Sequence, residues 1–144
     1  MIDISTLKIT SLLGSITVAS LFNMVGLSMP EKDDEKVRYA ILQFVKAGDA
    51  RSKATLDSIL HTDFRVVANQ LNGSNTLVII NKAQYLGLVE AGKLGGDTRS
   101  VQFETIEVVE NNASVRATIT GTTAVFQSFY HLVKNSSGQW LLIQ

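Results

Sequence analysis

The sequence contains no cysteine, a single proline and a single tryptophan among its 144 residues. The absence of cysteine excludes disulfide bonds, thiolate catalysis and metal or cluster sites built on cysteine, although it does not identify the cellular compartment. An excess of positive charge is also lacking, since 13 Lys and Arg residues balance 13 Asp and Glu residues. A nucleic-acid-binding surface needs a basic face, so we expect no nucleic-acid partner.

Histidine is equally scarce. The only two histidines, His61 and His131, lie far apart in the sequence, and a third metal ligand would have to be guessed. A Ser/His/Asp triad has no nucleophile elbow to support it. The glycine-rich loop Lys93–Thr98 lacks the Lys-Ser/Thr that follows the glycines of a phosphate loop. We therefore predict a domain with no metal site and no cofactor.

One long stretch has no charge. Residues 9–30, ITSLLGSITVASLFNMVGLSMP, carry no charged side chain, and the charged cluster Glu31–Lys36 follows them. This pattern is typical of a signal peptide, with a small-residue cleavage point near Val18-Ala19-Ser20. A helix packed on the domain or on a partner is the alternative, and a membrane anchor fits less well because polar residues interrupt the run. We predict an exported, periplasmic protein without stable membrane insertion; the alternative is a cytoplasmic one.

Helical periodicity follows this segment. Apolar residues from Val37 to Val45 recur at the spacing of one helix face, and Pro30 suits a first turn. Asn81 is an N-cap candidate, because Gln84 lies three residues later and completes a capping box. Glycines mark the ends of the first and third helices. The predicted helices run from Pro30 to Gly48, from about Ser52 to Leu60 and from Asn81 to Gly92.

The remaining segments have the pattern of strands. The first two are separated by Asn72-Gly73-Ser74, a turn signal, and are expected to form a hairpin. The last four are expected to form a curved antiparallel meander whose apolar face is covered by helices. The predicted strands are Phe64–Ala68, Thr76–Ile80, Val101–Val109, Ala113–Thr120, Val125–Lys134 and Gln139–Gln144. We therefore predict one α+β domain over residues 30–144, preceded by a separate segment, 1–29.

Three segments carry a family resemblance: FVKAGDARSKATLDSILHTDFRVV, NKAQYLGLVEAGKLGGDTRSVQFETIEVVENNASVRATI and FQSFYHLVKNSSGQWLLIQ. Together with the element order they resemble the lumazine-binding branch of the nuclear transport factor 2 (NTF2) superfamily, which is similar to SnoaL-like polyketide cyclases. The resemblance covers roughly residues 32–144. It implies an NTF2-like cone, in which three N-terminal helices pack on a strongly curved, mainly antiparallel sheet around a pocket. It also implies a homodimer.

The resemblance implies a small-molecule ligand, with heteroaromatic compounds as one class. Two alternatives stay open: a cofactor-free cyclase, isomerase or dehydratase, and a dimeric assembly module with a vestigial pocket. An enzyme of this kind needs a base and a hydrogen-bond donor for a developing oxyanion. The candidates for the base are Asp63 and His61. The candidates for ligand-binding donors are Arg65, Tyr85, Tyr130 and His131.

Each candidate also has a structural explanation. Asp63 can bond local backbone N–H groups in a turn, and His61 can end a helix and contact its carbonyls. Arg65 can pair with Asp63 or with a glutamate across the sheet. Tyr85 shares a face with apolar residues and suits the core. By strand parity, His131 lies on the face opposite Tyr130, where a dimer contact competes with a ligand contact.

Overall fold

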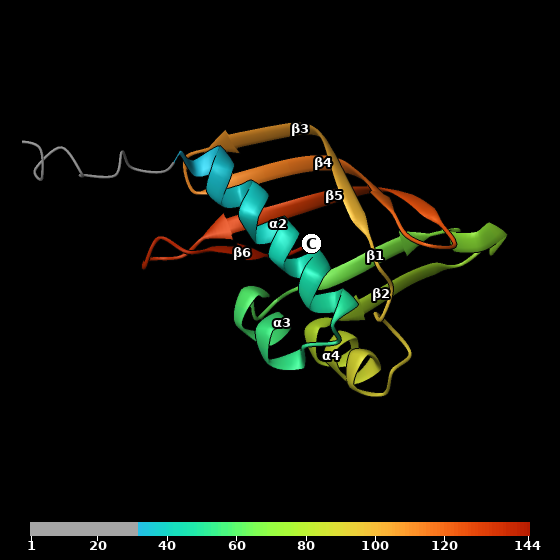
Figure 1. Cartoon of the computed structure of the whole chain (residues 1–144). Helices are drawn as coiled ribbons and strands as arrows, with labels where there is room; N and C mark the ends of the chain where they lie inside the picture. Colours follow the sequence, from blue (N-terminus) through green and yellow to red (C-terminus); the bar gives the residue numbers. More distant parts are fainter. Residues whose placement is uncertain (1–31) are drawn as a thin grey trace, which may run out of the picture. The chain divides into compact units, whose positions relative to one another are not determined.

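The computed structural model describes residues 32–144 (Figure 1). The uncharged run, its predicted cleavage point and Pro30 lie outside these residues, so export and the boundary between 1–29 and 30–144 stay predictions. Helices and strands follow one another in the predicted order. They are α2 (Asp33–Asp49), α3 (Lys53–Ile59), β1 (Arg65–Asn69), the 3-10 helix η2 (Leu71–Gly73), β2 (Leu77–Asn81), α4 (Lys82–Glu90), β3 (Ser100–Val109), β4 (Asn112–Thr120), β5 (Val125–Lys134) and β6 (Trp140–Leu142).

The strands form two antiparallel sheets. The larger sheet has the order β3-β4-β5-β6, which confirms the predicted meander, and the smaller sheet is the hairpin β1-β2. The base of the hairpin is tied to the end of the chain, because the Arg65 N–H donates to the Ile143 carbonyl at 3.1 Å. A parallel bridge between Leu60 and Leu142 lies beside this contact. The α+β fold class predicted from the sequence is confirmed.

The alternation of side chains sets which face of the large sheet is buried. On β4, the residues Ala113, Val115, Ala117 and Ile119 are all buried, as their spacing predicts. On β5, Tyr130 and Leu132 point to the same core. The register of β3 against β4 shifts between Phe103 and Thr105, and Figure 1 shows β3 bending along its length. A bulge of this kind increases local bending, which helps the sheet to curve around the core.

Helix α2 covers the core face of the large sheet, which it crosses diagonally in Figure 1. Its predicted apolar stripe is buried throughout: Val37, Ala40, Ile41, Phe44 and Val45. The helix continues through Gly48 to Asp49, so the end predicted at this glycine is wrong. A Cβ at Gly48 would lie 2.7 Å from Arg99 Nη2, so a larger residue there would displace the Arg99 guanidinium. We call α2 together with β3–β6 the α2–sheet body.

Polar side chains fasten both ends of α2. At its start, Asp33 accepts hydrogen bonds from Lys134 Nζ at 2.8 Å and from Trp140 Nε1 at 3.3 Å. These two bonds hold the pKa of Asp33 below its ordinary value. At its end, Asp49 accepts from Arg99 Nε at 2.5 Å, and Arg99 Nη2 also donates to the Val45 carbonyl at 3.0 Å. The body is therefore closed at both ends by charged contacts.

Candidate functional site

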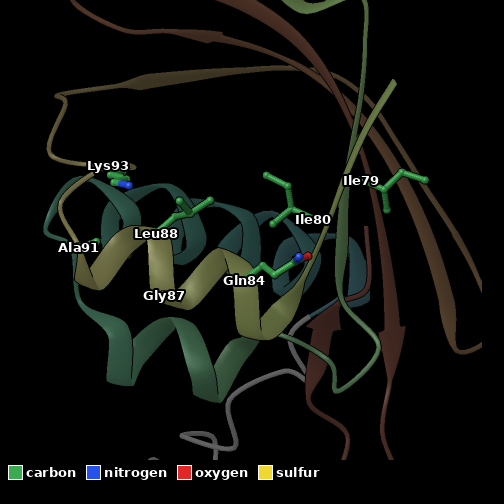
Figure 2. Close-up of a pocket in the computed structure, with 7 residues that line it drawn as sticks. All are labelled: Ile79, Ile80, Gln84, Gly87, Leu88, Ala91 and Lys93. Atoms are coloured by element: carbon green, nitrogen blue, oxygen red, sulfur yellow. The ribbon is translucent and has the colours of Figure 1, made fainter. Parts of the chain in front are cut away.

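A hollow of about 420 Å³ lies between β2 and α4 (Figure 2). In Figure 2 the side chains of Leu88 and Ile80 extend toward the same space from the helix and from the strand, while Lys93 lies beyond the end of α4. We call this the β2–α4 hollow. Its lining residues are Ile79, Ile80, Gln84, Gly87, Leu88, Ala91 and Lys93.

The start of α4 positions the helix side of the hollow. The Asn81 side chain accepts from the Gln84 N–H at 2.9 Å, and Gln84 Oε1 accepts from the Asn81 N–H at 3.0 Å. This is the capping box that the sequence predicted. Because Gln84, Leu88 and Ala91 are spaced by four and three residues, they share one side of α4 and meet the hollow together.

The neighbouring side of α4 faces the protein core. Tyr85, Leu86 and Val89 are buried there, so α4 has apolar residues on two sides rather than on one. The strand β2, on the other side of the hollow, also has apolar side chains on both of its faces. Ile80 packs partly against the core, while Ile79 remains 58% exposed. The hollow is therefore an apolar surface that no other described element covers.

The loop after α4 carries Lys93 and is fastened by Arg51. The Arg51 side chain donates to three backbone carbonyls: those of Gly92 (3.3 Å), Leu94 (3.3 Å) and Gly95 (3.1 Å). Arg51 has a φ of 51°, a left-handed conformation that is uncommon for a residue other than glycine. Conformations of this kind cost about 1–3 kcal/mol, which the surrounding contacts must offset.

Glycine is required where this loop approaches α2. Gly95 and Gly96 have φ values of 76° and 82°, and the Gly96 N–H donates to the Gly48 carbonyl at 3.2 Å. A Cβ on Gly95 would collide with that carbonyl, and a Cβ on Gly96 would collide with the Arg51 guanidinium. The loop therefore has a fixed path, which places Lys93 at one end of the hollow.

Aromatic rings fill the core beside α4. The Phe44 ring lies 5.9 Å from Tyr85, 6.1 Å from Phe64 and 6.1 Å from Tyr130, measured between centroids. Burial raises the pKa of Tyr85 to about 12, and it also raises the pKa of Tyr130. Both phenols feel the positive charge of Arg99, which lowers each pKa by a smaller amount. Both tyrosines are thus neutral groups whose hydroxyls lie within the influence of the Arg99 charge.

A sequence model of the family described as "Putative lumazine-binding" matches residues 32–144. The chain belongs to this family. The match confirms the resemblance inferred from the sequence and covers every helix and strand of the lumazine-binding-family domain. No curated protein matches the chain.

Solved structures place the lumazine-binding-family domain in the NTF2-like fold. An NTF2-like protein of unknown function from Shewanella baltica superposes with a TM-score of 0.66 at 12% identity, over 81% of this chain and 92% of that one. A conserved protein from Planctomyces limnophilus gives 0.61 at 19%, over 77% and 91%. A ketosteroid isomerase-like protein from Erwinia carotovora atroseptica gives 0.55 at 14%, over 78% and 92%. At these identities the likeness shows the fold alone.

The two candidate bases of the lumazine-binding-family domain lie together in the turn between α3 and β1. His61 Nδ1 accepts from the Asp63 N–H at 3.1 Å, and the Asp63 carboxylate lies 3.7 Å from the same nitrogen. The Asp63 side chain is 81% exposed and the His61 side chain 33%. The imidazole therefore caps its own turn rather than the helix carbonyls, and neither residue lines the β2–α4 hollow.

The four candidate donors are dispersed. Arg65 is exposed at the start of β1, where its register partner is Asn81, and it forms no ion pair with the described residues. Tyr85 and Tyr130 are buried and are brought together around Phe44. His131 is exposed on the opposite face of β5 and its N–H donates to the Gln144 carbonyl at 2.8 Å. None of the four lines the hollow.

Sequence reasoning did not single out Arg51, Asp49, Lys93 or Arg99. One signal was available for the Arg99–Asp49 ion pair. Asp49 is an acidic residue in the last turn of a helix, where the helix dipole is unfavourable for a negative charge. Such a residue indicates a cationic partner, although the sequence does not say which one. Among residues 32–144 the structure shows no cluster of three metal-ligating acidic or imidazole groups. In the same residues, no helix is long and apolar enough to span a membrane.

Proposed function

We propose that this NTF2-like domain binds a small molecule in the β2–α4 hollow. The observation that carries the proposal is the lining itself: aliphatic and glycine positions surround the space, and Gln84 and Lys93 are the polar members. Binding sites for small molecules are concave, mostly apolar and about 300–1,000 Å³ in volume, with few polar groups. The volume of about 420 Å³ lies within this range.

Several observations favour binding over catalysis. An enzyme of the cyclase or isomerase type needs a carboxylate or imidazole held near its substrate. His61 and Asp63 do not line the hollow, and Asp63 is largely exposed. The buried side chains of the described residues include no charged group. A binding role asks only for apolar contact and a few donors, and the hollow offers both.

A heteroaromatic ligand is one class that the hollow accommodates. A flat heterocycle such as lumazine would lie against Leu88 and Ile80, and its carbonyl oxygens would accept from the polar lining groups. The Gln84 amide is available for this purpose, since only its oxygen is used by the capping box. The family description supports this class, while the aliphatic lining gives no aromatic surface for stacking.

The test combines native mass spectrometry with probe titration. Gently purified protein is analysed for a co-purified molecule, and the protein is titrated with lumazine and with the neutral fluorescent dye N-phenyl-1-naphthylamine. Leu88→Asp places a carboxylate in the hollow, and Leu42→Asp makes the same change on an exposed site of α2. We expect Leu88→Asp to weaken binding at least about tenfold, because desolvating an unpaired carboxylate costs more than about 1.4 kcal/mol.

The control variant should bind like the wild type. If Leu88→Asp and Leu42→Asp bind every bound probe as tightly as the wild type, the ligand lies elsewhere and the proposal fails. If no probe binds the wild type and nothing co-purifies with it, the proposal of a binding function fails. That outcome favours the alternative of a dimeric assembly module with a vestigial pocket.

We also propose that the domain forms a homodimer through the outer face of the large sheet. Phe129, on the opposite face of β5 from Tyr130, is 61% exposed, and Val109 and Val125 are exposed at strand ends. In the sheet register, Phe129 lies next to Arg116, and His131 next to Ser114. Sedimentation velocity would show the monomer for Phe129→Lys and the dimer for Tyr39→Lys, an equally exposed aromatic of α2. A monomeric wild type would contradict the proposal.

A further inference from the structure

We infer that the β2–α4 hollow selects amphipathic anions: molecules with an apolar body and one negative group that binds beside Lys93. This inference rests on the proposed function and adds the class of ligand. The apolar body would contact Ile80 and Leu88, which extend toward the same space in Figure 2. The negative group would lie at the end of the hollow where α4 gives way to the glycine-rich loop.

The hydrogen-bonding groups of the lining favour a ligand that brings acceptors. Gln84 Oε1 already accepts from the Asn81 N–H at 3.0 Å, so the free part of this side chain is its NH₂ group, a donor. The Lys93 ammonium has three donors and no acceptor. Both polar side chains of the hollow therefore present donors, and a complementary ligand must bring acceptors.

The charges around the hollow favour a ligand with a negative group. Three nearby cations already have carboxylate partners. Lys53 pairs with Glu90 at 2.7 Å, and Lys82 pairs with Asp57 at 2.9 Å. Arg99 pairs with Asp49 at 2.5 Å. These pairs are electrically neutral, so none of their carboxylates is left to pair with Lys93.

Two cations near the loop are not neutralised by carboxylates of the described residues. Lys93 forms no ion pair with the described residues. The Arg51 guanidinium donates to the uncharged carbonyls of Gly92, Leu94 and Gly95. Asp97, the acidic residue of the loop, accepts from the Thr98 N–H and from the N–H and hydroxyl of Thr122. These bonds do not cancel the negative charge of Asp97, so two cations stand against one carboxylate near the loop. The end of the hollow at Lys93 therefore keeps a net positive charge, which complements an anion.

The geometry of α4 limits the size of the apolar body. Gln84 and Ala91 mark the extent of the helix side of the hollow, and they lie about 10 Å apart along the axis at about 1.5 Å per residue. This length suits two aromatic rings or a chain of about eight carbons, given about 1.25 Å per extended methylene. A negative group at one end of such a body would reach the Lys93 end while the body stays on Leu88.

The test uses two dyes with one ring skeleton. N-phenyl-1-naphthylamine is neutral, and 8-anilinonaphthalene-1-sulfonate adds a single sulfonate. Both are titrated into the full chain by fluorescence, and the ratio of their dissociation constants is compared between variants. Lys93→Met removes the charge and keeps the length of the side chain, whereas Lys36→Met removes the same charge from the first turns of α2.

We expect Lys93→Met to weaken sulfonate binding about two- to fivefold, the range of an exposed ion pair of up to about 1 kcal/mol. Binding of the neutral dye should stay unchanged, and Lys36→Met should leave both dyes unaffected. Added salt should reduce the preference for the sulfonate in the wild type, because it screens exposed charges.

Two contrary outcomes are distinguishable. If Leu88→Asp abolishes binding of both dyes but Lys93→Met leaves their ratio unchanged, the hollow binds small molecules without selecting anions; the inference then fails and the proposed function stands. If Leu88→Asp affects neither dye, the hollow is not the binding site and both fail.

Discussion

The α2–sheet body and the β2–α4 hollow differ in the exposure of their apolar residues, which are buried in the body and partly exposed at the hollow. In the body, Ile41 is fully buried between the helix and the sheet. In β2, Ile79 is the same residue type and is 58% exposed, as is Leu77. Both segments are rich in apolar side chains, so composition does not explain the difference.

The difference comes from pattern and topology. The apolar residues of α2 occupy one face, and the large sheet covers that face. The strand β2 has four consecutive apolar residues, LVII, which place apolar side chains on both of its faces. Its sheet has only two strands, and α4 adjoins only part of it. Apolar surface is therefore left exposed because the small sheet cannot cover it, and the part of this surface at Ile79 and Ile80 lines the hollow.

Matched isoleucine variants give the sharpest test of this comparison. Ile41→Ala should lower the free energy of unfolding by about 2–5 kcal/mol, since it opens a cavity in a packed core. Ile79→Ala should lower it by less than about 1 kcal/mol, as expected for an exposed site. Urea unfolding followed by circular dichroism measures both. Equal losses would mean that β2 is covered in solution, and the comparison would fail.

Charged contacts should show a similar but smaller contrast. Arg99→Met leaves Asp49 partly buried without its ion-pair partner, so we expect a loss of about 1–3 kcal/mol in the free energy of unfolding. Lys53→Met breaks the more exposed pair with Glu90 beside the hollow and should cost at most about 1 kcal/mol. The same urea experiment applies. A smaller loss for Arg99→Met than for Lys53→Met would contradict the assignment of Arg99 to the closure of the body.

Alkaline titration tests whether Tyr85 of α4 is buried in the core against the α2–sheet body. Burial raises the pKa of Tyr85 to about 12, above its ordinary value of 10.0. Because the folded value is the higher one, the contribution to stability is complete below pH 10.0 and is lost as pH rises through about 12. Ultraviolet absorbance of tyrosinate should show a late component that Tyr85→Phe removes. A Tyr85 that titrates at its ordinary value would place it in contact with water.

The smallest effect concerns the outer face of the large sheet. The hydrogen bond from Thr118, then that from Gln127, and the charge of Arg116 hold the pKa of Glu104 below its ordinary value of 4.5. Its contribution is therefore present above pH 4.5 and is lost as pH falls through the lower folded value. The urea midpoint should fall less on acidification for Glu104→Gln than for the wild type. Glu107→Gln, on the same strand, serves as the control.

Short-range features of this protein were predictable from the sequence. The Asn81–Gln84 capping box involves residues three positions apart, and the buried alternation of β4 follows from a period of two. Each pattern is complete within one segment of chain. The family resemblance then supplied the order in which these segments pack.

Long-range features could not be predicted in the same way. Arg51 binds carbonyls 41 to 44 positions away, and Arg99 binds Asp49 across 50 positions. Nothing in the neighbouring sequence specifies these partners. The same is true of the bulge after Phe103 and of the hollow, whose lining comes from β2, α4 and the following loop. The predicted site residues were chosen for their chemistry, whereas the hollow is defined by where apolar surface remains uncovered.

Trp140 gives this protein a built-in spectroscopic label. It is the only tryptophan of the chain, so indole emission reports a single location. The indole of Trp140 extends from β6 to the first turn of α2, where it donates to Asp33. The Lys134 ammonium lies 5.2 Å from the centroid of its ring. The loop at the end of the hollow contacts the opposite end of the same helix. Detachment of the start of α2 can thus be followed without any added dye, whereas occupancy of the hollow calls for a reporter of its own.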